Sequence, residues 1–262
     1  MFFVVDWVRR RLAAREPFPN AWRVHLERRV PFYRWLDADE KRRFEDKLKI
    51  FVRTKHFEGV KGMVVDDEVK VVIAAAAARL VMNLPHEHYA RLIDVVVYPA
   101  HFKPKDAEVG TALGLAFGAG TVILSWDAVL TGLADPHDGH DTATHEFAHA
   151  LDAADGAFDG TPNLRTFNAY GPWTRVMTDS FEHLRDAPRN GRRPLLRDYG
   201  ATNEAEFFAV ATEVFFEKPV EMKERQPALY DVLSLYYRAD PARHRARAAG
   251  PQPKPSAAPI RE

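Results

Sequence analysis

Two histidines and a glutamate stand close together in the stretch THEFAHALDAADG, residues 144–156. His145 and His149 are four positions apart, and Glu146 directly follows the first of them. On an α-helix, positions four apart lie on one face about one turn from each other, so both imidazoles can reach one metal ion. The glutamate projects beside them, where it can take a proton from a water molecule. This HExxH pattern is typical of a zinc site with a general base.

The composition restricts which other groups can take part. The chain has 262 residues and no cysteine, so disulfides are excluded and any metal must be held by nitrogen and oxygen ligands. Basic and acidic residues balance at 37 each, so no net field favours direct binding to nucleic acid. The apolar run 71–82 contains Arg79 and is too short to span a membrane. We therefore expect a cytoplasmic protein that binds one Zn²⁺ per chain.

A catalytic zinc needs a third protein ligand and a position open to water. The metzincin pattern requires a histidine six residues after His149, but Asp155 stands there. A downstream glutamate is the remaining choice, and the candidates are Glu182, Glu204, Glu206, Glu213 and Glu217. Successive helical turns are about 5.4 Å apart, so only one carboxylate of a helix reaches a given ion. The positive end of the helix dipole favours Glu204 or Glu206, and spacing alone leaves both open.

Four other histidines are weaker candidates. His86 and His88 are alternate residues after a proline, and residues at that spacing do not chelate from one helix face, so we expect a solvated loop. His137 and His140 fall in the polar loop before the HExxH motif. They either line the site or lie on a surface loop, which is the commoner case.

The elements that must position these residues are mostly helices. Hydrophobic spacing and breaker residues predict helices at 39–54, 68–84, 145–153, 172–186, 203–219 and 220–237. Thr142 or Thr144 can cap the motif helix. Strands are expected at 93–99 and 121–126, the second as the latter arm of a hairpin about Gly118–Gly120. The fold class is therefore α+β: a mainly helical single domain with a small sheet beside the HExxH helix.

Several separate blocks of the sequence resemble the Mlc titration factor A (MtfA) family of zinc metallopeptidases. They are HEFAHALDAADG with DGTP (159–162), VILSWDAVL (122–130), KHFEGVKGM (55–63), IAAAAARLV, VVVYP (95–99) and EFFAVATEVFFEKP (206–219). The similarity covers about residues 20–235. The family's zinc site is in turn similar to that of anthrax lethal factor. We predict an N-terminal helical segment at 1–19, a zinc metallopeptidase domain at 20–238, and a flexible tail rich in Pro, Ala and Arg at 239–262.

The resemblance implies roles for individual residues. His145 and His149 match the imidazole ligands, Glu146 matches the general base, and Glu206 matches the third ligand. The lethal-factor likeness implies that Tyr199, seven residues before Glu206, assists catalysis; an ordinary core or loop tyrosine is the alternative. The second acidic residue that lethal factor carries one turn after its glutamate ligand is Val210 here, so details tied to that position do not transfer.

The residues around the motif suggest one further role. Asp152 follows His149 by three positions and so shares the ligand face of the helix. Metal-bound histidines usually donate their other N–H to a carboxylate or carbonyl, and Asp152 can accept it. A contact at the end of the helix is the alternative.

The resemblance also implies an activity and a partner. It implies aminopeptidase-like hydrolysis of peptides and binding to Mlc, a glucose-responsive transcriptional repressor. The strand at 121–126 lies just upstream of the motif, and its edge can accept an extended peptide. A non-enzymatic zinc protein that sequesters a transcription regulator is the alternative, but Glu146 argues against it because a structural zinc site has no use for a base. A tail that folds over the cleft and inhibits is a further hypothesis.

Overall fold

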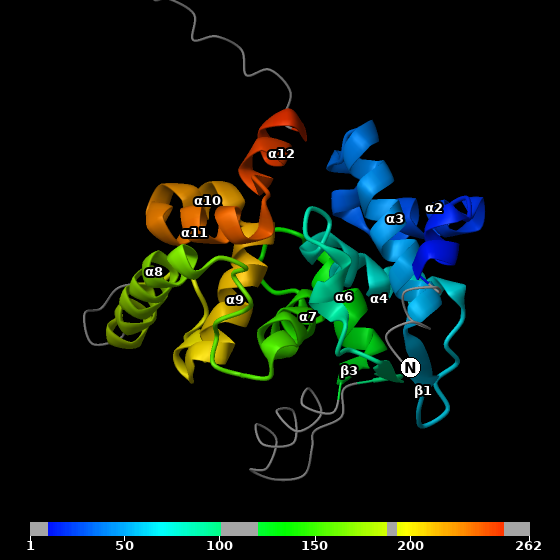
Figure 1. The fold of residues 1–262 in the computed structure, drawn as a ribbon, viewed down its shortest axis with the longest axis horizontal. Coiled ribbons are helices and arrows are strands. Elements are labelled where there is room, and N and C mark those ends of the chain that lie inside the picture. Colours follow the sequence, from blue (N-terminus) through cyan, green and yellow to red (C-terminus); the bar gives the residue numbers. More distant parts are fainter. Residues whose placement is uncertain (1–9, 101–119, 188–192, 249–262) are drawn as a thin grey trace, which may run out of the picture.

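The computed structural model describes residues 10–100, 120–187 and 193–248, and these form a mainly helical domain with one small sheet (Figure 1). The α-helices are α2 (Asn20–Arg29), α3 (Ala38–Thr54), α4 (Asp67–Leu80), α6 (Trp126–Ala134), α7 (Thr142–Asp152), α8 (Phe167–Asp186), α9 (Glu204–Glu217), α10 (Pro219–Arg225), α11 (Pro227–Tyr237) and α12 (Pro241–Ala248). Short 3-10 helices are η1 (Pro31–Trp35), η2 (His86–Tyr89), η3 (Ala153–Asp155) and η5 (Asp198–Ala201). The predicted α+β class is confirmed. None of the described helices combines the length and apolar character that a membrane crossing requires.

The sheet consists of three parallel strands in the order β1-β2-β3, which are His56–Gly59, Asp94–Tyr98 and Thr121–Ser125. The strand predicted at 93–99 is confirmed as β2, and β3 ends one residue early because Trp126 begins α6. Pairing of β3 with β2 is parallel, and the other arm of the predicted hairpin lies outside the described residues. Strand β1 was not predicted, since its four residues alternate little and three are exposed.

Helix α7, which carries the HExxH motif, begins at a carboxylate cap. The side chain of Asp141 accepts hydrogen bonds from the backbone N–H of Thr144 (3.0 Å) and from its hydroxyl (2.7 Å). The prediction that Thr142 or Thr144 caps the helix is therefore wrong, because Thr144 is the donor to the cap. Only Thr142 and Glu146 of this helix are not buried, so α7 is a central helix whose geometry is set on nearly all sides.

Two apolar helices pack against α7: α4, which precedes it in the chain, and α9, which follows it (Figure 1). Five consecutive alanines (Ala74–Ala78) make α4 thin, and all of them are buried. Helix α9 is buried along its whole length after the exposed Glu204, as expected for a helix with apolar residues all round. Asn203 caps α9 by accepting a hydrogen bond from the backbone N–H of Glu206 (2.9 Å), which fixes the first turn.

The C-terminal region differs from its prediction in two places. The single helix expected at 220–237 is broken into α10 and α11, because Pro227 begins a new helix after Gln226. The tail expected to be flexible from residue 239 is helical at 241–248 and packs on the domain, so that expectation is wrong for this stretch. Residues 249–262 lie outside the described residues. In the N-terminal segment predicted to be helical, residues 10–15 form a helix and residues 1–9 are not described.

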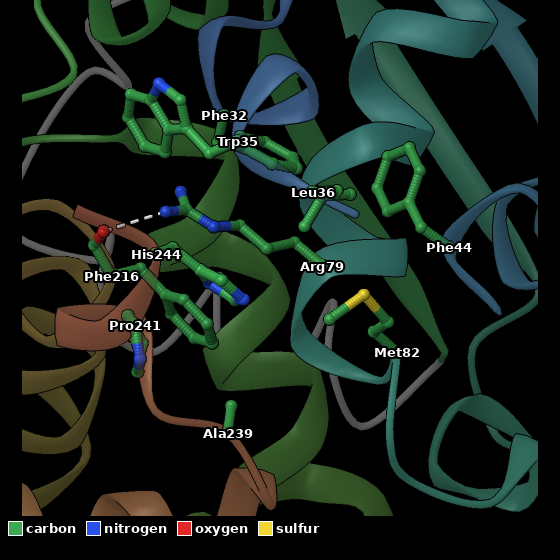
Figure 2. Close-up of a pocket in the computed structure, with 10 residues that line it drawn as sticks. All are labelled: Phe32, Trp35, Leu36, Phe44, Arg79, Met82, Phe216, Ala239, Pro241 and His244. Atoms are coloured by element: carbon green, nitrogen blue, oxygen red, sulfur yellow. Dashed lines mark hydrogen bonds between the residues drawn. The ribbon is translucent and has the colours of Figure 1, made fainter. Parts of the chain in front are cut away.

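Helix α12 is held by one polar contact to a distant part of the chain and by another just before its first residue. His244 pairs with Glu40 of α3 (2.8 Å), and the hydroxyl of Tyr230 donates to Asp240 (2.5 Å). Figure 2 shows a pocket that lies between α12, η1, α4 and the end of α9. Arg79 crosses it and donates to the carbonyl oxygen of Phe216 (2.7 Å). None of the histidines and glutamates of the HExxH region lines this pocket.

Candidate metal centre

Helix α7 places its two motif histidines on one face. The Nε2 atoms of His145 and His149 lie 3.1 Å apart, and their rings are nearly perpendicular, at 85° with centroids 4.7 Å apart. Both side chains are buried. The four-residue spacing therefore produces the convergence that the sequence predicted.

Helix α9 supplies a carboxylate to the same point. Oε2 of Glu206 lies 3.0 Å from Nε2 of His145 and 3.3 Å from Nε2 of His149. Glu204, the alternative in the same turn, is exposed, and Glu182 on α8 is exposed as well. Of the five candidate glutamates, Glu206 alone joins the two imidazoles in the group that could hold a metal ion.

The distances within this group fit a bound divalent ion. A tetrahedral ion with bonds of about 2.0–2.1 Å has its ligand atoms about 3.3–3.4 Å apart. The three atoms of the group lie 3.0–3.3 Å from one another. Two imidazole nitrogens this close, beside a carboxylate oxygen, direct lone pairs at one point, which a cation stabilises. The residues therefore fit a metal ion with nitrogen and oxygen ligands.

A second buried glutamate of α9 orients the first histidine. Nδ1 of His145 lies 2.5 Å from Oε1 of Glu213, whose side chain is fully buried. Because the carboxylate can only accept, Nδ1 carries the proton and Nε2 keeps its lone pair for the metal position. Arg197 donates to the other oxygen of Glu213 at 2.5 Å. The chain Arg197–Glu213–His145 thus fixes the imidazole from behind.

The ionisation of the group reflects this arrangement. Burial acts against a charged imidazole, but hydrogen bonds to Glu206 and Glu213 outweigh it and raise the pKa of His145 to about 10. Burial lowers the pKa of His149. Burial opposes ionisation of Glu206 too, yet its bonds to the two histidines hold its pKa well below the usual range. A metal ion entering this site therefore competes with a proton on His145.

Glu146 lies beside the group without joining it. Burial raises its pKa to about 7, and the charges of Glu206 and Glu213 add to the effect while His145 opposes it. Within the described part of the chain, its Oε2 is buried and makes no hydrogen bond. A carboxylate with a pKa near neutrality can both accept and return a proton at physiological pH.

Two aromatic rings lie against the two imidazoles. Tyr199, in η5, has its ring centroid 5.9 Å from that of His145, and Phe158 has its centroid 5.1 Å from that of His149. Burial and the charge of Glu206 raise the pKa of Tyr199 to about 12, so its phenol stays protonated and can donate. Tyr199 is 49% exposed, so it is not a core tyrosine.

Asp152 has the role of a helix-end contact. Its Oδ2 accepts a hydrogen bond from the backbone N–H of Gly160 (2.9 Å), and the side chain is fully buried. Gly160 has φ 77°, and a Cβ there would lie 2.3 Å from the carbonyl oxygen of Glu204. Asp152 thereby ties the loop after α7 to the start of α9. This is the contact at the end of the helix that was predicted from the sequence as the alternative to a bond with His149.

The other histidines lie apart from the group. His88 is buried and packs edge-on against Tyr236, so the expected solvated loop is wrong for this residue. The ring of His137 lies near Trp35, with centroids 6.2 Å apart. The backbone N–H groups of Gly139 and His140 both donate to Oε2 of Glu217 (2.9 Å each). Glu217 therefore anchors the loop before α7 and is not a metal ligand.

Sequence reasoning considered Glu213 only as a metal ligand and did not single out Arg197. The available signal was the seven-residue spacing of Glu206 and Glu213, which places both on one side of α9. One carboxylate then meets Nε2 of a histidine and the other meets Nδ1 of the same ring. That division depends on how α7 and α9 pack, which spacing does not give.

A helix that presents HExxH, packed against a second helix that adds a glutamate to the same point, defines a centre of the metallopeptidase type. The sequence profile of the family described as glucose-regulated metallo-peptidase M90 matches residues 4–238. The chain belongs to this family, so the resemblance predicted from its motifs is confirmed.

Individual relatives agree with this assignment. The chain is 36% identical over 248 residues to an uncharacterized protein of Synechocystis sp., and the match covers 90% of each chain. It is 28% identical over 236 residues to Mlc titration factor A of Enterobacter sp., covering 84% of this chain and 87% of the relative. The corresponding protein of Serratia proteamaculans is 26% identical over 227 residues, covering 81% and 85%.

Proposed function

We propose that this protein is a zinc-dependent peptidase with aminopeptidase-like activity. The observation that carries the proposal is the convergence of His145, His149 and Glu206 beside Glu146, whose Oε2 atom is buried and whose pKa is raised to about 7. A structural zinc site has no use for such a carboxylate, since its ligands are complete without a base.

The donor set favours zinc among the divalent metals. Two imidazoles and one carboxylate are a known ligand set for catalytic zinc, which keeps a further position for water or substrate. Sites for magnesium or calcium use oxygen ligands. When bound, zinc supplies Lewis-acid chemistry that polarises a carbonyl and makes water more acidic.

The chain's own residues then carry the proton transfers. Glu146 takes a proton from the water that attacks the peptide carbonyl, and it gives that proton to the departing amine. The phenol of Tyr199 donates a hydrogen bond to the oxyanion that forms on the carbonyl. Arg197 and Glu213 keep Nε2 of His145 directed at the ion. These roles divide the reaction between a base, an oxyanion donor and a fixed ligand set.

Strand β3 is the natural place for an extended substrate. Among the strands that the structure describes, β3 is an edge strand and packs against α7, so a peptide that pairs with it runs beside the motif. Main-chain hydrogen bonds to a strand hold a peptide extended and leave its side chains to select between sequences.

The names of the relatives support a regulated role. Mlc titration factor A is named for Mlc, and the family is described as glucose-regulated. We infer that the chain binds an Mlc-like transcriptional repressor in the cytoplasm. The same names favour one alternative, a non-enzymatic zinc protein that sequesters the repressor.

Hydrolysis of amino-acid p-nitroanilides by the zinc-loaded wild type and by Glu146→Gln separates these functions. Loss of a general base lowers the rate by about 10²–10⁴-fold, and the variant should keep its zinc because Glu146 is not a ligand. Equal rates in the two proteins would remove the peptidase proposal. Zinc binding with no hydrolysis in either would favour sequestration.

A further inference from the structure

The metal centre is bordered by an aromatic side chain that carries no polar atom. Phe158 is 38% exposed, and its ring packs against the imidazole of His149 with centroids 5.1 Å apart. The second ring at the centre, Tyr199, has a hydroxyl and can donate to a reacting oxygen. Phe158 can offer only apolar contact, so hydrogen bonding cannot explain its position.

The loop that carries Phe158 is held at both ends. Gly156, at φ 103°, lies against Arg91, since a Cβ there would be 2.8 Å from its guanidinium nitrogen. Gly160 donates its N–H to the buried Asp152 and lies against the start of α9. Between these two points, the backbone N–H of Ala157 donates to the side chain of Asp155 (2.9 Å). Phe158 is therefore presented beside His149 by a constrained turn.

This arrangement leaves part of an apolar ring facing solvent at the metal position. The ring is tilted by 41° against the imidazole of His149. Its exposed part loses no hydrogen bond when another apolar group displaces water from it. A peptide whose carbonyl reaches the metal position brings the side chains flanking that carbonyl within a few ångströms of it. The group best suited to cover the ring is an aliphatic or aromatic side chain.

We propose that Phe158 forms the apolar wall of a subsite for a residue flanking the scissile bond, and that the enzyme selects substrates with a large apolar side chain there. The inference rests on the proposed peptidase function and names its substrate class. Phe158 is a specificity-determining residue in this account, and it takes no part in proton transfer.

Phe167 provides a matched control. It is also a phenylalanine, is 91% exposed at the start of α8, and belongs to neither the metal group nor the Phe158 loop. Replacing either ring by alanine removes the same atoms, but only Phe158→Ala removes them from the proposed subsite. Phe158→Leu keeps an apolar wall and serves as the conservative variant.

The test uses zinc-loaded protein and quenched fluorescent peptides that carry leucine or serine on either side of the cleaved bond. In the wild type, kcat/KM should be higher for a leucine peptide, and Phe158→Ala should lower the leucine-to-serine ratio about tenfold, the scale of a lost apolar contact in a pocket. Phe158→Leu should keep most of the ratio and Phe167→Ala all of it, with one zinc per chain throughout. A ratio unchanged in Phe158→Ala would overturn the proposal, as would its loss together with zinc, which would assign the ring to support of His149.

Binding separates this inference from the proposed function. The dissociation constants of the same peptides, measured with Glu146→Gln and with Glu146→Gln carrying Phe158→Ala, do not depend on turnover. If the wild type cleaves nothing, the peptidase proposal fails, while a binding preference for leucine that disappears with Phe158 still supports the apolar wall. Equal binding of both peptides by the two variants would reject the wall even if hydrolysis is observed.

Discussion

The two ends of helix α9 carry buried glutamates that meet opposite surroundings. Near its start, Glu206 faces the Nε2 atoms of two histidines, and its pKa is held well below the usual range despite burial. At its end, Glu217 faces two backbone N–H groups, and burial, with the charges of Asp141 and Asp138, raises its pKa to about 8. The two are eleven residues apart, about 16 Å along the helix.

The comparison shows that burial alone does not identify a metal-binding carboxylate. Both side chains are buried and both make two short contacts. Glu217 meets donors that already carry protons, so its contacts are complete within the protein. Glu206 meets Nε2 nitrogens, and that of His145 offers a lone pair when Nδ1 holds the ring's proton in its hydrogen bond to Glu213. The partner atoms, and not the depth of the side chain, separate a candidate ligand from a structural anchor.

The largest effect should come from replacing the Glu206 carboxylate by an amide, with the same replacement at Glu217 as the comparison. Glu206→Gln should lose more than about 100-fold in zinc affinity, beyond the usual range for groups that only support a ligand. Glu217→Gln keeps an oxygen that can accept from Gly139 and His140, so its zinc affinity should match the wild type. Competition with a fluorescent zinc chelator measures both. Similar losses in the two variants would erase the distinction between the ends of α9.

A smaller effect is expected midway along the helix. Glu213→Gln replaces the acceptor of His145 Nδ1 by a weaker one and leaves Arg197 without its charged partner. We expect zinc affinity to fall about 10–100-fold, as for other groups that orient a ligating histidine. Arg197→Met should follow in the same direction with a smaller loss. An affinity unchanged in Glu213→Gln would show that the imidazole needs no support from behind.

Gly160→Ala should disturb only the start of α9, near Glu206, and leave the end that carries Glu217 unchanged. A Cβ at this position would lie 2.3 Å from the carbonyl oxygen of Glu204, and φ is 77°. Such a conformation costs a residue with a side chain about 1–3 kcal/mol. The melting temperature should therefore fall by several degrees and zinc affinity should weaken modestly. Gly62→Ala, also at positive φ but with open space around it, is the control for backbone strain alone.

The last effect concerns the pH dependence of stability. The pKa of Glu217 is raised to about 8 in the folded protein, so the folded state binds more protons than the unfolded state between the ordinary glutamate pKa and that value. Stability should consequently fall as pH rises through this window, and Glu217→Gln should flatten the fall. Thermal unfolding of zinc-free protein from pH 5 to pH 8 measures this slope. Parallel curves for wild type and variant would show that the carboxylate is already ionised.

The metal centre was predictable from sequence to the extent that it depends on one helix. The HExxH spacing determines how His145 and His149 converge, whatever the rest of the fold. The choice of Glu206 over Glu204 came from family resemblance, because the dipole argument applies to both. In the structure the two differ simply in which side of α9 faces α7. Spacing within one helix cannot supply the rotation of that helix against another.

The parts that were predicted wrongly depend on contacts between distant segments. Helix α12 has a composition typical of a flexible tail, but Glu40, more than two hundred positions away, binds its His244. Strand β1 is short and largely exposed, and it exists because it pairs with β2. The cap of α7 is Asp141, which is set by the loop that Glu217 holds. The secondary-structure propensities of neighbouring residues cannot identify these distant partners.

The most direct test of the account is the zinc stoichiometry of protein purified without chelators and then offered the ion. Elemental analysis after removal of free metal should give one zinc per chain for the wild type and none for the double variant His149→Ala, Glu206→Gln. Stoichiometric zinc retained by the double variant, or none bound by a folded wild type, would contradict the claim that these side chains hold a metal.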